Sequence, residues 1–139
     1  MNSKINFTGS ILGLTAIVLG AFGAHSLKEV LTIEQLTTFE TGVKYQMYHA
    51  LFLLFLGLNN QINEKLRKMI FYFISFGVLF FSGSIYLLAT NTITSFDFKV
   101  IGFITPIGGL LLIIAWSLLF FNILKNKSQF QENSTQSKI

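Results

Sequence analysis

Long runs of apolar residues, separated by short polar segments, are the dominant pattern of this chain. Four such runs extend over about residues 7–24, 45–58, 69–89 and 100–121. A helix of about 20 apolar residues crosses the hydrocarbon core of a bilayer, which is about 30 Å thick. The first, third and fourth runs satisfy this length directly. The pattern therefore predicts an all-α integral membrane protein, built as a four-helix bundle.

The second run is short, but the polar segment before it, residues 26–44, extends the same helix. Thr32 and Gln35 have the spacing of a capping box, which marks the beginning of a helix. Apolar residues then recur at helical spacing into the run: Leu36, Phe39, Val43, Met47, Ala50 and Leu54. We expect one helix to begin near Ile33, to form an amphipathic interfacial segment between the first two spans, and then to enter the bilayer.

The first run has two interpretations. Lys4 before the run and the small residues near Ala21 and Gly23 resemble a secretory signal with its cleavage site. Small residues also recur every three or four positions, at Gly9, Gly13, Ala16, Gly20 and Ala24. Because such a stripe lets a second helix approach closely in lipid, we favour a retained helix. Gly83, Gly108 and Gly109 are expected to serve helix packing in the later spans.

The amino-acid composition also indicates a membrane environment. Apolar residues make up 52% of the 139 residues and charged residues 12%, whereas soluble domains have about 25% charged residues. A small domain cannot hide that much apolar surface in its own interior. The chain has no cysteine, which excludes disulfides and cysteine-based sites. We expect a four-span membrane domain over residues 1–124 and a disordered polar tail over residues 125–139.

The basic residues predict an orientation. With four crossings, both termini and the loop over residues 59–68 share one side, and seven of the ten Lys and Arg residues lie there. The positive-inside rule then places both termini in the cytoplasm and the chain in the inner or plasma membrane. Since topology explains the basic charge, no nucleic-acid partner is expected. The expected partners are the lipid bilayer and, as a possibility, another membrane protein or a second copy of the chain.

Polar side chains gather toward the predicted outer ends of the helices. This candidate polar cluster comprises His25, Glu40, Lys44, Tyr45, Gln46, Tyr48, His49, Tyr86 and Thr105. If the first two spans are antiparallel neighbours, His25 and His49 approach each other, and Glu40 lies at helical ion-pair spacing from Lys44. Ionisable residues in membrane segments are functional candidates. In the alternative interpretation, these groups satisfy one another and anchor the helix ends.

Four sequence motifs, in the same order, resemble a small membrane-protein family catalogued as domain of unknown function 423. The family includes bacterial inner-membrane members and the eukaryotic transmembrane protein 256 group. The motifs are Gly20–Lys28 (GAFGAHSLK), Phe39–Ala50 (FETGVKYQMYHA), Phe81–Tyr86 (FSGSIY), and Ile104–Gly109 (ITPIGG) with Trp116 downstream. Ser26 and Ala115 stand where glycine is usual, which is a change between small residues. The resemblance implies a four-helix multi-pass protein of the cytoplasmic membrane, and it implies no activity.

No motif assigns a catalytic residue. The chain has no recognisable nucleophile, metal or phosphate-loop motif, and none of the four apolar runs contains Asp or Glu. Two histidines with Glu40 would supply three zinc ligands, but their spacing does not support a metal site, and no cofactor is expected. The favoured function is a non-enzymatic structural or assembly component of the membrane, although an enzymatic role is left open. The alternatives are a small transporter or channel, and a lipid- or quinone-binding protein that uses the His/Tyr cluster.

Overall fold

The structure, a computed structural model of the whole chain, describes the backbone of residues 1–95 and 97–136 and the side chains of residues 1–95 and 97–127. The described chain forms four long α-helices: α1 (Asn2–His25), α2 (Ile33–Leu58), α3 (Glu64–Ala89) and α4 (Ile104–Gln136). Short 3-10 helices occupy the connections at Leu27–Glu29 (η1), Asn91–Ile93 (η2) and Phe98–Ile101 (η3). The predicted all-α class with four helices is confirmed.

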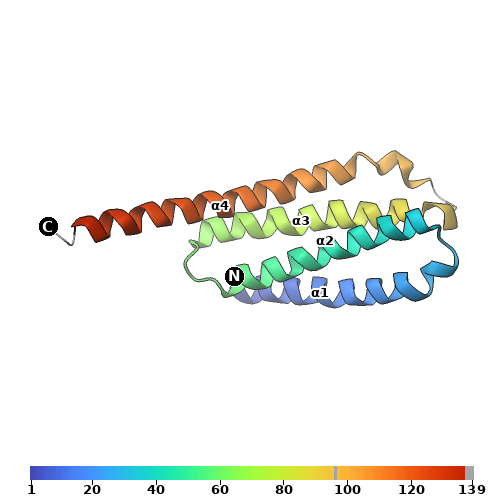
Figure 1. Cartoon of the computed structure of the whole chain (residues 1–139), viewed down its shortest axis with the longest axis horizontal. Coiled ribbons are helices and arrows are strands. Elements are labelled where there is room, and N and C mark those ends of the chain that lie inside the picture. The colour runs from blue at the N-terminus through green and yellow to red at the C-terminus, as the bar shows by residue number, and fades with distance from the viewer. Residues whose placement is uncertain (96, 137–139) are drawn as a thin grey trace.

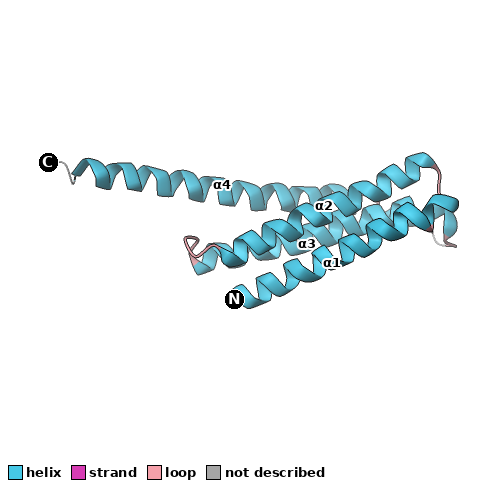
Figure 2. Cartoon of the chain, turned by 60° about the horizontal axis from the view of Figure 1, so that its bottom comes forward, coloured by secondary structure: helices cyan, strands magenta, loops and turns pink. Residues whose placement is uncertain are grey.

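The helices lie side by side in chain order, and each runs antiparallel to the one before it (Figure 1). Thus α1 packs along α2, α2 along α3, and α3 along α4. The α1–α2 and α3–α4 connections lie at one end of the bundle, and the N-terminus and the α2–α3 connection lie at the other. In the turned view, α4 extends beyond the other helices (Figure 2).

The outer surface of the bundle is apolar. Within the described residues, three helical stretches are long and apolar enough to cross a membrane: Asn2–Glu29, Glu64–Ala89 and Phe98–Lys127. Large apolar side chains such as Phe7, Leu79 and Ile113 are exposed on them. Exposed apolar surface on this scale is unfavourable in water and favourable in lipid. The surface therefore indicates a bilayer environment.

The helix α2 differs from α3 in composition and not in length. It has 26 residues, like α3, but its first turns carry threonine, glutamate and lysine side chains. Its beginning matches the prediction, because the Thr32 hydroxyl accepts from the Gln35 backbone N–H while the Gln35 side chain accepts from the Thr32 N–H. Gln35 also donates from Nε2 to Thr92 Oγ1 at 2.9 Å. The helix therefore begins at the level of the α3–α4 connection, beyond the end of α3.

Two apolar clusters form the core, and polar residues of α2 separate them. The larger cluster lies toward the end of the bundle that carries the N-terminus and contains Ile5, Phe52, Leu53, Leu56, Ile62, Ile70, Ile74, Val78, Leu112, Ala115 and Leu119. The smaller cluster lies at the opposite end and contains Leu27, Leu31, Phe39 and Ala89. Between Phe39 and Phe52, α2 buries Gln46 and His49. These two side chains therefore form a polar layer within an otherwise apolar bundle.

Small residues of α1 face α2, with one difference from the expected stripe. A Cβ atom on Gly9 would lie 3.0 Å from the Ala50 carbonyl oxygen, and Gly20 faces Val43. At the end of the helix, Gly23 is buried against the Phe39 ring, whereas the side chain of Ala24 is exposed. The assignment of Ala24 to the packing face was wrong. Steps that alternate between three and four residues keep one helix face toward a neighbour, and Gly23 continues that alternation.

The α3–α4 contact depends on Gly108. A Cβ atom there would lie 2.3 Å from the Phe81 backbone nitrogen, so only glycine allows the two backbones this distance. Gly109 faces the Phe81 ring at ordinary contact distance. A Cβ atom on Gly83 would meet no described atom within 4 Å. Gly83 therefore takes no part in the α3–α4 contact, and its role in helix packing stays a prediction.

The fourth helix begins and ends later than its apolar run. Residues Phe98–Ile101 form a 3-10 helix, and α4 begins at Ile104, with Pro106 in the first turn, where no intrahelical N–H is needed. Its backbone is helical to Gln136. The expected tail over residues 125–139 lies largely outside the described side chains. Its disorder, and the boundary of the membrane domain at residue 124, stay predictions.

Candidate functional site

Gln46 is the centre of the polar layer and contacts three helices. Its side chain is 5% exposed. The amide nitrogen Nε2 donates to the Leu12 carbonyl oxygen at 2.9 Å and to Thr15 Oγ1 at 2.7 Å, both on α1. The amide oxygen Oε1 accepts from the Tyr86 hydroxyl of α3 at 2.8 Å. A single amide thus joins α1, α2 and α3, and both of its N–H donors have partners.

Tyr86 reaches Gln46 because α2 has a glycine one turn before it. A Cβ atom on Gly42 would lie 2.7 Å from Tyr86 Cε1, so the tyrosine ring lies directly against the α2 backbone. The same ring packs against Phe39, with 4.9 Å between ring centroids. The ring therefore lies against the turn of α2 that contains Gly42, and its hydroxyl reaches Gln46 in the next turn. Sequence reasoning missed Gly42, although its position four residues before Gln46 was an available signal.

His49 lies one turn beyond Gln46 and joins α2 to α4. It is also 5% exposed. Its Nδ1 lies 2.7 Å from the Tyr45 carbonyl oxygen, and a carbonyl can only accept, so Nδ1 carries the hydrogen. The other nitrogen, Nε2, is then an acceptor, and Trp116 Nε1 donates to it at 3.3 Å. Sequence reasoning placed Trp116 in a motif but did not recognise it as the partner of His49.

An aromatic groove surrounds this contact. Tyr45 packs against Phe81 with ring centroids 4.8 Å apart, and Phe52 meets Trp116 edge to face at 4.6 Å. Between them, a groove of about 450 Å³ separates α2 from α4, with Phe81 of α3 among its walls. Tyr45 and Trp116 line it and are partly exposed. The groove opens toward the surroundings of the bundle, which here are lipid.

A second polar contact ties α3 to α4 near the α3–α4 connection. Ser84 is buried, and its Oγ lies 2.7 Å from Thr105 Oγ1. Ser84 Oγ also donates to backbone carbonyls of its own helix. Thr105 was among the predicted cluster residues, but the structure pairs it with Ser84 and not with the α2 residues. The residues of the predicted cluster therefore belong to at least two separate sets of contacts.

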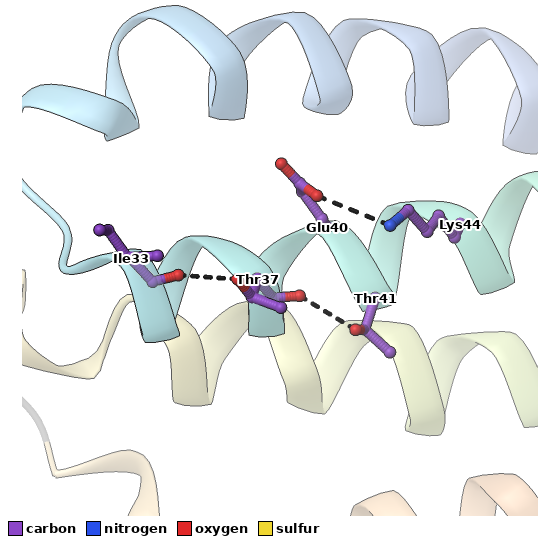
Figure 3. Close-up of polar contacts among 5 residues, drawn as sticks. All are labelled: Ile33, Thr37, Glu40, Thr41 and Lys44. Atoms are coloured by element: carbon purple, nitrogen blue, oxygen red, sulfur yellow. Dashed lines mark hydrogen bonds and ion pairs between the residues drawn. The ribbon is translucent and has the colours of Figure 1, made fainter.

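The charged members of the predicted cluster lie on the outside of α2. Lys44 Nζ is 3.6 Å from Glu40 Oε2, and both side chains are exposed, as Figure 3 shows. This confirms the ion pair expected from their spacing. In the same turns, the Thr37 and Thr41 hydroxyls donate to the carbonyl oxygens of Ile33 and Thr37. The polar groups in this part of α2 are thus satisfied locally, a common pattern for threonine in helices.

His25 and His49 do not approach each other. Gly23, next to His25 in sequence, faces Phe39, whereas Gly13 faces Ala50, the neighbour of His49. Twelve residues of helix separate His25 from Gly13, or about 18 Å. His25 is exposed at the end of α1, and Tyr48 is exposed on another face of α2. The expected approach was wrong because His49 lies at the level of Gly13, in the middle of α1, and His25 lies at the end of that helix.

The zinc arrangement considered from the sequence is not assembled. Within the described residues, no group of three or more histidine, aspartate or glutamate side chains lies close enough to hold a metal ion. Glu40 pairs with Lys44 on the surface, and His49 uses both ring nitrogens within the bundle. The three proposed ligands therefore belong to three different environments.

Arg67 is a polar residue of the bundle interior that sequence reasoning counted only as a marker of orientation. It is 8% exposed. Nη1 donates to Asn2 Oδ1 at 2.7 Å, and Nη2 donates to the carbonyl oxygens of Asn59 and Ile62 at 2.8 and 2.7 Å. The guanidinium thus ties the start of α1 and the α2–α3 connection to α3. Its planar set of donors suits several oxygens held at fixed positions.

An apolar exterior, helices of membrane-spanning length and a buried polar layer define a multi-pass α-helical membrane protein. Residues 19–109 match the family described as protein of unknown function (DUF423). The chain belongs to this family, as its motifs suggested. The matched region extends from the end of α1 to the start of α4, so it includes Gln46, His49 and Tyr86 and ends before Trp116.

Relatives come from distant bacteria. The chain is 38% identical to a UPF0382 membrane protein of Staphylococcus saprophyticus over 117 residues, covering 84% of this chain and 93% of the relative. It is 35% identical to one of Haemophilus influenzae over 128 residues, covering 92% and 99%. It is 30% identical to the UPF0382 inner membrane protein YgdD of Escherichia coli over 121 residues, covering 85% and 87%. No solved structure matches the chain. These relatives are membrane proteins by name, and their names state no activity.

Proposed function

We propose that the protein is a non-enzymatic structural or assembly component of the inner or plasma membrane. The observation that carries this proposal is the use of the buried polar groups. Gln46, His49 and Tyr86 each make a hydrogen bond to a neighbouring helix, and the other bond of His49 goes to the Tyr45 carbonyl of its own helix. In lipid, such contacts help to hold helices together, where apolar side chains alone gain little from burial. In this proposal, the polar layer therefore serves to hold the helices of the bundle together.

The same geometry gives less support to transport. A transport pathway needs polar or ionisable groups that face a water-filled passage. Gln46 and His49 are buried with partners, and the charged pair Glu40–Lys44 lies on the outer surface. A carrier that used His49 would first have to break its bonds to Tyr45 and Trp116. We therefore rank transport below a structural role.

A function in assembly implies a partner, either another membrane protein or a second copy of this chain. The test is purification from native membranes in a mild detergent, followed by mass determination of the intact complex. We expect a defined complex larger than one chain. The matched functional assay is solute flux in liposomes, compared between the wild type and His49→Ala. Flux that disappears in His49→Ala would overturn the proposal.

The orientation belongs to the same proposal. Both termini face the cytoplasm, because seven of the ten basic residues fall in the two terminal segments and in the loop over residues 59–68. The chain has no cysteine, so single introduced cysteines are unambiguous reporters. In intact cells or spheroplasts, an impermeant maleimide should label Thr92→Cys and leave Ser3→Cys unlabelled. The reverse pattern would show the opposite orientation.

A second candidate function, binding of a lipid or quinone, is favoured by the groove between α2 and α4. The groove of about 450 Å³ is within the range of small-ligand sites, and Tyr45, His49 and Trp116 line it. Trp116 is the one tryptophan of the chain, so the tryptophan fluorescence comes from a side chain that lines this groove. Saturable quenching by a short-chain ubiquinone, lost in Gly109→Leu, would favour this function. Quenching that rises linearly with concentration would count against it.

A further inference from the structure

Polar groups that line the aromatic groove between α2 and α4 have fixed hydrogen-bonding roles. His49 Nδ1 donates to the Tyr45 carbonyl oxygen at 2.7 Å, so Nε2 of the neutral imidazole can only accept. The indole Nε1 of Trp116 can only donate. Ser117, another polar residue of the lining, donates its hydroxyl hydrogen to the Ile113 carbonyl of its own helix. The groove therefore presents one fixed acceptor beside one fixed donor.

The bond between these two groups is long, and one of its partners is exposed. Trp116 Nε1 lies 3.3 Å from His49 Nε2, whereas a typical N–H···O bond measures about 2.7–3.2 Å. His49 is buried and held by the Tyr45 carbonyl, but the Trp116 side chain is 51% exposed. The indole can therefore move outward and admit a ligand atom between the two nitrogens. That atom must accept from Trp116 and donate to His49.

A hydroxyl group meets both requirements, and a carbonyl group meets only one. The hydroxyl oxygen accepts from Trp116 while the hydroxyl hydrogen is donated to His49. A carbonyl oxygen can accept from Trp116, but it leaves the His49 acceptor buried without a donor. An unpaired buried polar group is costly, and hydrocarbon supplies no other donor. The pair therefore favours a ligand that carries a hydroxyl over the same ligand with a carbonyl in its place.

The walls of the groove suit a flat ring. Tyr45 and Phe81, with ring centroids 4.8 Å apart, are two aromatic walls, and Trp116 is a third. Aromatic rings pack favourably against one another in offset and edge-to-face arrangements. Gly109 lines the groove without a side chain, and a Cβ atom there would lie 3.6 Å from the Phe81 ring. The volume of about 450 Å³ is that of a site for one small ligand.

We propose that the aromatic groove binds a quinol, the reduced form of a membrane quinone, in preference to the quinone itself. This inference rests on the second candidate function, lipid or quinone binding, and names its ligand. One ring hydroxyl lies between His49 Nε2 and Trp116 Nε1, the ring lies against Tyr45 and Phe81, and the isoprenoid tail extends into lipid. Two hydrogen bonds then replace the one between His49 and Trp116, so neither nitrogen loses its partner.

The test is a competition between the two redox forms of a short-chain ubiquinone, which differ at the ring oxygens and share the tail. The full chain in mild detergent is mixed under argon with equal amounts of both forms. After removal of free ligand, the bound forms are extracted and quantified by chromatography. We expect the quinol to exceed the quinone by about fivefold, the ratio that one net hydrogen bond contributes.

Substitutions at the two nitrogens separate their roles. His49→Phe, which removes the acceptor and keeps a ring, should retain both forms equally. His49→Gln, whose amide offers a donor and an acceptor, should also retain both equally. Trp116→Phe should bind both forms more weakly and still prefer the quinol, because the His49 acceptor remains. The matched control is Tyr48→Phe, a change at an exposed tyrosine outside the groove lining, which should keep the wild-type ratio.

The outcomes distinguish this inference from the function on which it rests. Equal retention of both forms by the wild type, abolished in Gly109→Leu, would overturn the quinol preference and leave lipid or quinone binding standing. Retention of neither form would overturn both. An undiminished preference in His49→Phe and His49→Gln would overturn the assigned role of His49. Farnesol, an aliphatic alcohol, should not displace the quinol at equal concentration, and displacement by it would overturn the choice of an aromatic ligand. Circular dichroism verifies that each variant remains helical.

Discussion

The indole Nε1 of Trp116 lies 3.3 Å from Nε2 of His49 and connects α4 directly to α2 across the face of α3. The contact is possible because the Tyr45 carbonyl fixes the hydrogen on the other imidazole nitrogen. It lies at the middle of α2, between the two apolar clusters. A polar bond beside the aromatic groove therefore joins the helices at both sides of α3.

Replacing Trp116 by phenylalanine should weaken this connection modestly. The Phe52 edge-to-face contact can persist, but the hydrogen bond to His49 is lost, and a neutral bond of this kind contributes about 0.5–1.5 kcal/mol. We expect Trp116→Phe to lower the free energy of unfolding by about 1 kcal/mol in mixed micelles. In a His49→Phe background the same change should have less effect. A full effect of Trp116→Phe without His49 would show that the bond contributes nothing.

Gly42 should tolerate no side chain while Tyr86 is present. A Cβ atom there would lie 2.7 Å from the Tyr86 ring, so Gly42→Ala must displace the ring and its hydroxyl from Gln46. Overpacking of this kind costs about 1–3 kcal/mol. Thermal unfolding in nanodiscs should show a lower midpoint for Gly42→Ala. In a Tyr86→Ala background the same substitution should cost much less, because only the Ile85 Cγ2 atom, 3.1 Å from the added Cβ, remains close. An undiminished loss there would contradict the assigned contact.

Alanine substitutions at Gly108 and Gly83 are a matched pair that tests the packing of α3 against α4. Gly108→Ala would bring a methyl group to 2.3 Å from a backbone nitrogen of Phe81, which cannot move without moving α3. We expect a loss of about 3 kcal/mol or failure to fold. Gly83→Ala meets no described atom within 4 Å and should be neutral or slightly stabilising, because alanine favours helix. Comparable losses in both variants would contradict the helix contact as described.

Replacing Arg67 should destabilise the α2–α3 connection far more than replacing its neighbour Lys68. Arg67→Met removes three hydrogen bonds that hold the start of α1 and the α2–α3 connection. A hydrogen bond to a charged group contributes about 1.5–3 kcal/mol, so we expect a loss of at least that size. Hydrogen exchange should become faster at the α2–α3 connection in this variant. Lys68→Met, an exposed change of the same charge, serves as the control, and an equal acceleration in it would contradict the role of Arg67.

The helices and their local contacts were predictable from sequence because they depend on neighbours in the chain. The capping box at Thr32 and the ion pair between Glu40 and Lys44 are set by spacings of three and four residues. The pattern of apolar runs likewise predicted four helices. The apolar run over residues 100–121 does not mark the beginning of α4, because Val100 and Ile101 belong to a 3-10 helix and α4 begins at Ile104.

The polar layer was only partly predictable, because its partners come from different helices. Gln46, His49 and Tyr86 were recognised as polar residues in apolar surroundings, but nothing in a single sequence pairs Gln46 with Tyr86 or His49 with Trp116. These pairs depend on how far α2 is shifted relative to α3 and α4. That shift is set by the close approaches at Gly42 and Gly108, which are properties of two packed helices.

The most direct test of the account is a double-mutant cycle between Gln46 and Tyr86. The central claim, that the polar layer holds the bundle together, predicts that Gln46→Leu and Tyr86→Phe are coupled, because each removes one side of the same 2.8 Å bond. Interhelical hydrogen bonds in membranes show coupling of about 0.6 kcal/mol on average and up to about 1.7 kcal/mol. Reversible unfolding in mixed micelles measures this coupling. A value of at least about 0.6 kcal/mol agrees with the structure, and additive effects of the two substitutions would contradict it.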